Sequence, residues 1–217
     1  MALAPLVILD GSNATANQEM LQGVSGAGNN IPVVSLDSTR VTYRASANFT
    51  PTATGAVTII SITGSATKTV RIKRIFLGGV STAVSISTFM LQRVTALGAG
   101  GTTVTPTVAL LDRGASQAYA AATAVVSHYT TTLKATGTTL QGGPITTRQI
   151  GTNVVTTPAT AWIEAYAPLF PEGGAPIGSA IVLRGTSEIL EVQNVTPANL
   201  GAGTVLAYVV EWEEDAS

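Results

Sequence analysis

The chain has 217 residues, with 11 Lys and Arg, 12 Asp and Glu, one His and no Cys. Without cysteine, and with His128 as its single histidine, one chain cannot form a thiolate cluster, a disulfide framework or a multi-histidine metal centre, so we expect no metal and no cofactor. The alternative is a ring of His128 residues in an oligomer, which could still bind a metal. A formal net charge of -1 provides no basic surface for phosphate contacts, so direct nucleic-acid binding is not expected.

Charged residues make up 11% of the chain, against roughly 25% in ordinary soluble domains. Thr, Ala, Gly and Val together supply about half of the sequence, which favours β structure. The uncharged stretches Ala45–Thr67 and Gly114–Leu133 are interrupted by Thr, Ser, Gly or Gln, so neither resembles a membrane-spanning helix. Met1–Leu9 is apolar but lacks a preceding basic residue and a cleavage site, so no signal peptide and no membrane partner are expected.

Residues 1–39 differ in composition from the rest of the chain. They contain a turn cluster at Asp10–Asn13 and a run rich in Gly and Asn at Gly23–Asn30. Such a segment buries little apolar surface on its own. Two interpretations remain open, namely an extended N-terminal arm ordered by contacts with the body or with other chains, and a disordered leader.

From Arg40 onward, short β-like runs alternate with Gly, Pro and Thr, which is typical of a sandwich or barrel. The predicted strands are Val41–Phe49, Ala56–Thr63, Thr69–Leu77, Ala83–Val94, Val104–Leu111, Thr123–Tyr129, Ala161–Ala167, Ala180–Arg184, Glu188–Val192 and Thr204–Glu213. About ten strands fit one all-β domain over residues 40–217, a two-sheet antiparallel sandwich of jelly-roll-like form.

Two runs carry further detail. In Thr204–Glu213 both alternating faces begin apolar and end acidic, which predicts a strand buried on both sides that emerges into solvent at its end. In Thr69–Leu77 the apolar residues change phase near Lys73 and Arg74. A β-bulge at that point would reconcile the pattern.

The chain has one basic and one acidic cluster. They consist of Lys68, Arg71, Lys73 and Arg74, and of Glu211, Glu213, Glu214 and Asp215. The functional interpretation is that these clusters meet, within one chain or across a subunit boundary, and fix register and partner choice. We accordingly name Arg71, Lys73, Arg74, Glu211, Glu213 and Glu214 as candidate interaction residues, and reversing charge at Arg71 and Lys73 should weaken assembly. The alternative is two solvated strand ends of little energetic weight.

The sequence contains only weak catalytic motifs, so we predict that the protein is not an enzyme. Ser127 and His128, with Asp112 upstream, supply the residue types of a hydrolase triad, but adjacent residues of a strand point to opposite faces. The loop Gly98–Gly101 is followed by Thr and Val and opens no helix, so phosphate binding is unsupported.

Two further patterns have alternatives. Glu164, Glu188 and Glu191 could pair for glycoside hydrolysis, although isolated acids on strands are usually surface residues. The aromatic residues Trp162, Tyr166 and Phe170 recur every four residues and could stack on a glycan, although packing in the core is the favoured interpretation.

Three stretches, in this order and spacing, carry a resemblance to a known group of proteins. They are Ile62–Ile75 (ITGSATKTVRIKRI), Ala180–Glu188 (AIVLRGTSE) and Val210–Glu214 (VEWEE). They are similar to stretches in a loosely defined group of tailed-bacteriophage virion proteins, and the likeness extends over Ser35 to the C-terminus. Residues 130–170 follow that pattern poorly.

The resemblance implies a non-enzymatic structural protein located in the virion. If the chain is similar to capsid decoration (cement) proteins, it forms an oligomer, with a trimer favoured, on the major capsid protein and stabilises contacts between capsomers. The N-terminal arm would then reach a neighbouring subunit. The alternative within the virion is a tail, baseplate or fibre component that binds host glycan. An alternative from another class is a soluble carbohydrate-active or carbohydrate-binding protein on the same sandwich.

Overall fold

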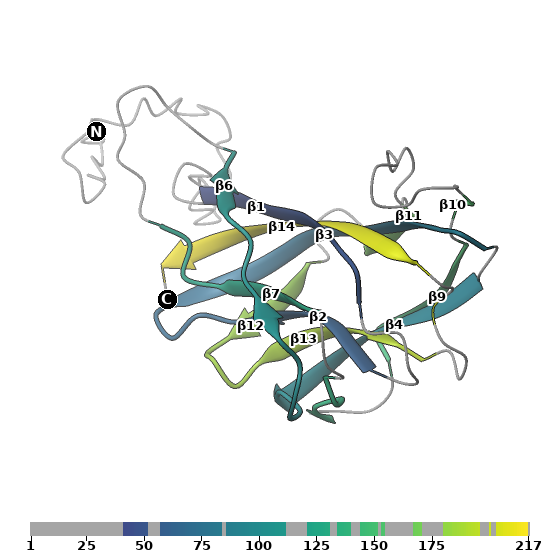
Figure 1. Cartoon of the computed structure of the whole chain (residues 1–217). Coiled ribbons are helices and arrows are strands. Elements are labelled where there is room, and N and C mark those ends of the chain that lie inside the picture. Colours follow the sequence, from purple (N-terminus) through teal and green to yellow (C-terminus); the bar gives the residue numbers. More distant parts are fainter. Residues whose placement is uncertain are drawn as a thin grey trace, which may run out of the picture. The chain divides into compact units, whose positions relative to one another are not determined.

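The computed structural model is built of β-strands throughout the residues that it describes (Figure 1). These residues are 41–51, 57–83, 86–111, 121–130, 134–139, 144–151, 153–154, 167–170, 180–195, 200 and 203–216. The chain divides into two compact units, Met1–Ser35 and Leu36–Ser217, and every described residue belongs to the second unit. The predicted N-terminal arm therefore lies outside the described residues.

Fourteen strands are found in the described residues. They are β1 (Val41–Phe49), β2 (Val57–Thr63), β3 (Lys68–Ser81), β4 (Ile86–Ala96), β5 (Thr103–Val104), β6 (Val108–Leu110), β7 (Val125–Tyr129), β8 (Thr138–Thr139), β9 (Thr146–Gly151), β10 (Asn153–Val154), β11 (Ala167–Phe170), β12 (Ile181–Arg184), β13 (Ile189–Asn194) and β14 (Val205–Ala216). All their pairings are antiparallel except that of β10 with β3.

The strands form two sheets that pack face to face, so the predicted antiparallel sandwich is confirmed (Figure 1). Sheet 1 has the order β6-β1-β14-β3, and β12, β11 and β10 pair in turn along the far edge of β3. Sheet 2 has the order β5-β7-β2-β13-β4, and β8 and β9 pair with the far edge of β4.

The connectivity is that of a jelly roll. Four strands of sheet 1, in the order β1-β14-β3-β12, face four strands of sheet 2, in the order β2-β13-β4-β9. The chain passes from one sheet to the other at each step from β1 to β4, and again at each step from β12 to β14. This alternation produces the two interlocked Greek keys of that fold. Strands β5 and β7 extend sheet 2 beyond these four strands, and β6 extends sheet 1 on the same side.

The core lies between the sheets and follows from the alternation of side chains along each strand. On β14, Leu206, Tyr208, Val210 and Trp212 face the core and are all buried. On its outer face Ala207 is buried, while Val205 and Val209 are partly exposed. The strand is therefore buried on both sides only in part, and each large inner side chain contributes roughly 1.5–3 kcal/mol by leaving water.

The predicted β-bulge in β3 is confirmed. The register between β3 and β14 shifts between Glu211, which lies opposite Arg74, and Trp212, which lies opposite Ile72. Lys73 is the extra residue. Because of this insertion, Ile75 returns to the inner face and the apolar phase change in the sequence is accommodated.

Other strand predictions need correction. The predicted strand Val104–Leu111 is wrong, because β5 and β6 lie in different sheets with Pro106 between them. Strand β9 was not predicted, since the sequence of Thr146–Gly151 is mostly polar, and β8 and β10 are too short to show a pattern. Most of the predicted strand Ala161–Ala167 lies outside the described residues. Only its last residue, Ala167, is described, and it is the first residue of β11.

Over the described ranges, no helix has the length and hydropathy needed to cross a bilayer.

Candidate functional site

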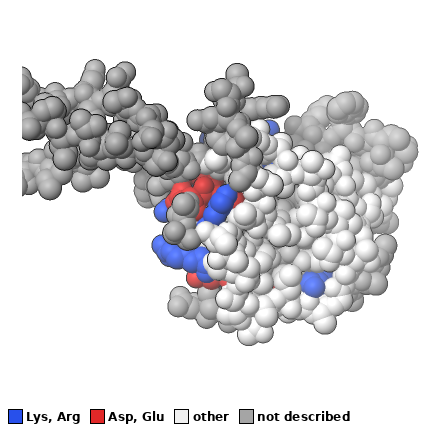
Figure 2. Space-filling view, turned by 90° about the vertical axis from the view of Figure 1, so that its left-hand side faces the viewer, with Lys and Arg blue, Asp and Glu red and all other residues white. Residues whose placement is uncertain are grey.

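The basic and acidic clusters meet within the chain, across strands β3 and β14. Antiparallel pairing places Arg74 opposite Glu211 and Arg71 opposite Glu213. Figure 2 shows all the red and most of the blue side chains of the face that it presents gathered in one region, with isolated blue side chains elsewhere on that face. The sequence prediction that the two clusters meet is confirmed in its intrachain form.

Most of these charges form a row of ion pairs on the outer face of sheet 1, which we call the charge ladder. Its pairs are Arg71 Nε to Asp215 Oδ2 at 2.7 Å, Lys73 Nζ to Glu213 Oε1 at 3.1 Å, Arg74 Nη1 to Glu211 Oε2 at 3.7 Å and Arg44 Nη2 to Glu211 Oε1 at 2.6 Å. Arg44 comes from β1 and also donates from Nε to Glu211 at 3.0 Å.

The charge ladder is worth little to the stability of the fold. The side chains of Arg44 and Arg74 are 46% and 61% exposed, so water screens their attraction to Glu211. Exposed pairs of this kind contribute about 0–1 kcal/mol each. Their role in contacts between subunits stays a prediction, as does the effect of charge reversal at Arg71 and Lys73.

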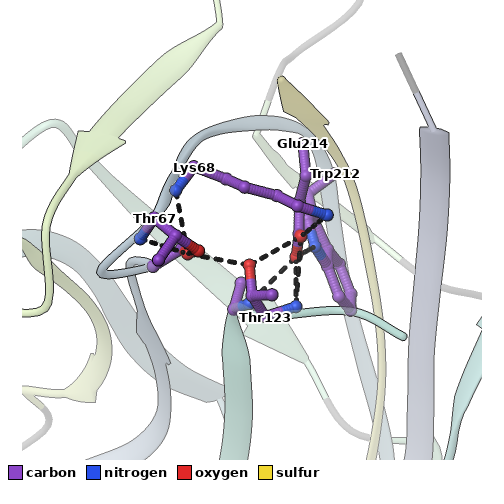
Figure 3. Close-up of polar contacts among 7 residues, drawn as sticks. Thr67, Lys68, Thr123, Trp212 and Glu214 are labelled. Atoms are coloured by element: carbon purple, nitrogen blue, oxygen red, sulfur yellow. Dashed lines mark hydrogen bonds and ion pairs between the residues drawn. The ribbon is translucent and has the colours of Figure 1, made fainter. Parts of the chain in front are cut away.

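Glu214 is different from its acidic neighbours, because its side chain points to the inner face and is fully buried. Its carboxylate accepts hydrogen bonds from Thr123 N, Ala124 N and Trp212 Nε1 at 2.9, 2.9 and 3.0 Å (Figure 3). It also accepts one from Thr123 Oγ1 at 2.7 Å and lies 3.4 Å from Lys68 Nζ. Each carboxylate oxygen is therefore saturated by donors.

The protonation of Glu214 follows from these donors. Burial alone would raise the pKa of the carboxyl, but the hydrogen bonds from Ala124, Trp212 and Thr123 together lower it below its ordinary value. The carboxylate is thus held ionised and cannot act as a proton donor near neutral pH. Its role is structural, because it ties the segment before β7 of sheet 2 to the last strand of sheet 1.

A turn at Ser65 extends this cluster, and Figure 3 labels its neighbours Thr67 and Lys68 beside Thr123. Ser65 Oγ accepts hydrogen bonds from the N–H groups of Thr67 and Lys68, both at 3.1 Å, and lies 2.8 Å from Thr123 Oγ1. The turn between β2 and β3 is therefore fixed to the same carboxylate. The sequence signalled Lys68 and Glu214 by their charge, but it gave no signal for Thr123, whose contribution depends on contacts about 90 residues away in the chain.

His128 and Ser127 do not form a catalytic pair. His128 points into the core, where Nδ1 lies 3.1 Å from Tyr208 Oη and the ring packs on Phe49 at 4.7 Å between centroids. Ser127 points outward, and its Oγ lies 3.3 Å from Thr105 Oγ1. The prediction that the two side chains lie on opposite faces is confirmed, and Asp112 lies outside the described residues.

The buried imidazole makes stability depend on pH. Burial lowers the pKa of His128, and its polar neighbour in the core is the neutral Tyr208, whose pKa burial raises. The unfolded chain takes up a proton near pH 6.5 whereas the folded chain does so only at lower pH, so the free energy of unfolding should fall as the pH drops below 6.5. Urea unfolding of wild type and His128→Gln between pH 5 and 8 checks this. The variant should lose the slope between pH 6.5 and 5, and an unchanged slope would contradict the assignment.

The two candidate glycosidase acids that the structure describes, Glu188 and Glu191, are not arranged as a catalytic pair. Glu188 lies in the turn between β12 and β13, where it accepts a hydrogen bond from Arg184 N at 2.7 Å and contacts Arg93 at 3.5 Å. Glu191 is fully buried on the outer face of sheet 2, held by Gly137 N and Gln193 Nε2, so it cannot touch a sugar ring. Glu164, the third candidate, lies outside the described residues.

The two remaining motifs give no ligand site in the described residues. Gly100 and Gly101 adopt positive φ values of 80° and 78°, and the loop packs on the Lys134 segment through a hydrogen bond from Ala135 N to Ala99 O. Trp162 and Tyr166 lie outside the described residues, so the aromatic stripe is not tested. The described residues contain no group of three or more His, Asp or Glu side chains placed to hold a metal ion.

Comparison of the chain with protein-family models, with curated proteins and with solved structures gave no match.

Proposed function

We propose that this chain is a non-enzymatic structural protein of a tailed-bacteriophage particle that decorates the capsid surface, binds the major capsid protein and stabilises contacts between capsomers. The observation behind the proposal is that the charged side chains of the sandwich pair with groups of the same chain. The charge ladder and Glu214 are engaged inside the chain, and beside them lies a broad face on which Figure 2 shows an isolated blue side chain in an otherwise white area. A surface with so few charges can be buried against a neighbour and leave few ions without water.

The stretches behind the resemblance support the proposal because they are neighbours in space. Val210–Glu214 lies on β14, which pairs with β3, and Ala180–Glu188 includes β12, which pairs with the other edge of β3. Ile62–Ile75 contains the first half of β3 itself. Together they form one unit, β12-β3-β14, which holds most of the charge ladder. A resemblance concentrated in one structural unit supports the proposal more strongly than a resemblance in three unconnected sequence stretches would.

The fold is compatible with the proposal and does not decide it. Jelly rolls occur in viral capsid proteins, in lectins and in cupins, so the sandwich alone assigns no activity. A capsid lattice repeats one contact many times, and each weak contact gains from that repetition. We favour a homotrimer as the decorating unit, because three-fold positions recur across such a lattice.

Two measurements test the proposal, namely the number of copies per particle and the binding of added chain to capsids that lack it. The number of copies per purified particle, measured by quantitative mass spectrometry, should reach hundreds if the protein covers the capsid. Purified chain added at micromolar concentration to expanded capsids that lack it should bind and raise their resistance to heat and to low salt. A few to a few dozen copies would instead indicate a tail, baseplate or fibre component. Failure to bind capsids at that concentration would overturn the proposal.

A further inference from the structure

Residues 134–139, which we call the crossing segment, pass over β13 on the outer face of sheet 2. The segment begins at the edge of β2, where Lys134 O accepts a hydrogen bond from Thr58 N at 2.9 Å. It ends as β8 at the edge of β4. Strand β13 lies between β2 and β4, and Gly137 of the crossing segment donates its N–H to Glu191 on β13. The segment therefore covers this side chain.

The carboxylate of Glu191 is completely buried, yet only one of its two oxygens has donors. Oε2 accepts hydrogen bonds from Gly137 N at 3.1 Å and from Gln193 Nε2 at 2.7 Å. Oε1 is buried without a hydrogen-bond partner among the described residues. A Cβ added to Gly137 would lie 3.1 Å from Oε1, so this oxygen faces a position that has no side chain. Unpartnered buried carboxylate oxygens are rare, and one in this position indicates a bound ion or water.

The negative charge of Glu191 also lacks a counter-ion in the part of the chain that the structure describes. None of the ion pairs found there includes Glu191. Lys134 of the crossing segment is buried as well, but its Nζ lies over the ring of Tyr129, 5.0 Å from the centroid. A buried carboxylate is costly unless a positive charge accompanies it, so the site favours a cation over water.

Further oxygen atoms surround this carboxylate. In the strand register, Ser61 of β2 and Gln92 of β4 lie directly opposite Glu191 on its two sides, and both are buried. Side chains in such positions share one face of the sheet, with Cβ atoms about 4.5–5.5 Å apart. Tyr129 Oη lies 2.6 Å from Ser61 Oγ. Burial raises the pKa of Tyr129 and the charge of Glu191 adds to that rise, so the phenol is within electrostatic reach of the carboxylate.

We propose that Glu191 Oε1 binds a monovalent alkali cation, sodium or potassium, with the side-chain oxygens of Ser61, Gln92 and Tyr129 as further ligands. Oxygen-only donors suit hard cations. A single carboxylate among neutral oxygens balances one positive charge, whereas a divalent ion would leave an excess charge buried. The ion would fix the crossing segment to β13. This site differs from the centres of three or more acids or histidines, which are absent from the described residues, and it does not depend on a role in a capsid.

The experiment measures the thermal unfolding of the full chain in sodium, potassium and N-methylglucamine chloride at equal ionic strength. N-methylglucamine is too large for the site, and equal ionic strength keeps the screening of surface charges constant. Sodium or potassium at several times its dissociation constant should raise the midpoint of wild type by roughly 2–4 °C above that in N-methylglucamine. Glu191→Gln should lose this difference.

Two further variants make the assignment specific. Glu188→Gln is the matched control, because it removes the same charge from the turn beside β13, and it should respond to the salts as wild type does. Ser61→Ala removes one ligand oxygen and should raise the cation concentration needed for half of the effect by roughly tenfold. Circular dichroism establishes that each variant is folded.

Three results would overturn the proposal. Equal midpoints of wild type in all three salts would mean that water or the Lys134 ammonium occupies the position beside Oε1. A salt response that Glu191→Gln retains would place the ion elsewhere. Stabilisation by calcium chloride that neither sodium nor potassium reproduces would contradict the monovalent assignment.

Discussion

Replacing Glu214 by alanine is expected to lower the free energy of unfolding by about 3–5 kcal/mol, because partners of a buried charge would be left unpaired. The variant removes the acceptor for Ala124 N and Trp212 Nε1, and it leaves the Lys68 ammonium without its partner. Urea unfolding followed by tryptophan fluorescence measures the loss.

Two controls separate the buried carboxylate from negative charge in general. Glu213→Gln changes the neighbouring residue, whose side chain lies on the outer face and pairs with Lys73, and should cost less than about 1 kcal/mol. Glu214→Gln keeps the size of the side chain but removes the charge and half of the acceptor capacity, so its cost should fall between the other two. Equal losses for Glu213→Gln and Glu214→Ala would contradict the structural role of Glu214.

Glu214 makes the free energy of unfolding depend on pH in the opposite sense to a buried carboxylic acid that stays protonated. Because its pKa in the folded chain lies below its ordinary value, the ionised form stabilises the fold. That contribution is fully present above the unfolded pKa of about 4.3 and is lost as the pH falls through the lower folded value. The difference in stability between wild type and Glu214→Gln should therefore shrink in acid below pH 4.

Replacing Trp212 by alanine is expected to lower the free energy of unfolding by about 3–5 kcal/mol, the usual cost of a large aromatic cavity. Trp212 is fully buried, and its ring stacks on Tyr43 of the adjacent strand with 5.7 Å between centroids. Thermal unfolding with calorimetry measures the effect. Trp212→Phe keeps much of the packing but removes the indole donor to Glu214, so it should cost clearly less than alanine.

A double-mutant cycle links the two buried residues. If the indole of Trp212 stabilises the fold partly through Glu214, the combined Trp212→Phe and Glu214→Gln variant should lose less than the sum of the two single losses. Additive losses would show that the hydrogen bond at 3.0 Å contributes nothing beyond the packing of the ring.

The sequence predicted those parts of the fold in which a strand has a clear inner face. Strands β1, β2, β12 and β14 alternate or are continuously apolar, and their predicted bounds agree with the structure to within about three residues. The bulge in β3 was predicted for the same reason, since a phase change in an otherwise regular strand has few other solutions. Strand β9 could not be predicted, because an edge strand of polar residues takes its conformation from its partner β4.

The candidate site was predicted in part, and the missing part depends on register. Charge alone indicated that Arg71, Lys73 and Arg74 face an acidic strand, but it did not indicate which acid would lie inside. Glu214 is buried because it shares the inner face of β14 with Val210 and Trp212, and the bulge in β3 keeps Ile72 opposite Trp212 on that face. Arg44 joined the ladder through the pairing of β1 with β14, which no local pattern encodes.

The central place of β14 in sheet 1 has a consequence for the order in which the protein is made. This strand lies between β1 and β3, yet it is the last of the described strands to leave the ribosome. Until it has been synthesised, the facing edges of β1 and β3 have no partner, and sheet 1 cannot close. Sheet 1 therefore closes only once β14 has emerged, and its closure depends on pairing residues as distant in the chain as Lys68 and Ala216.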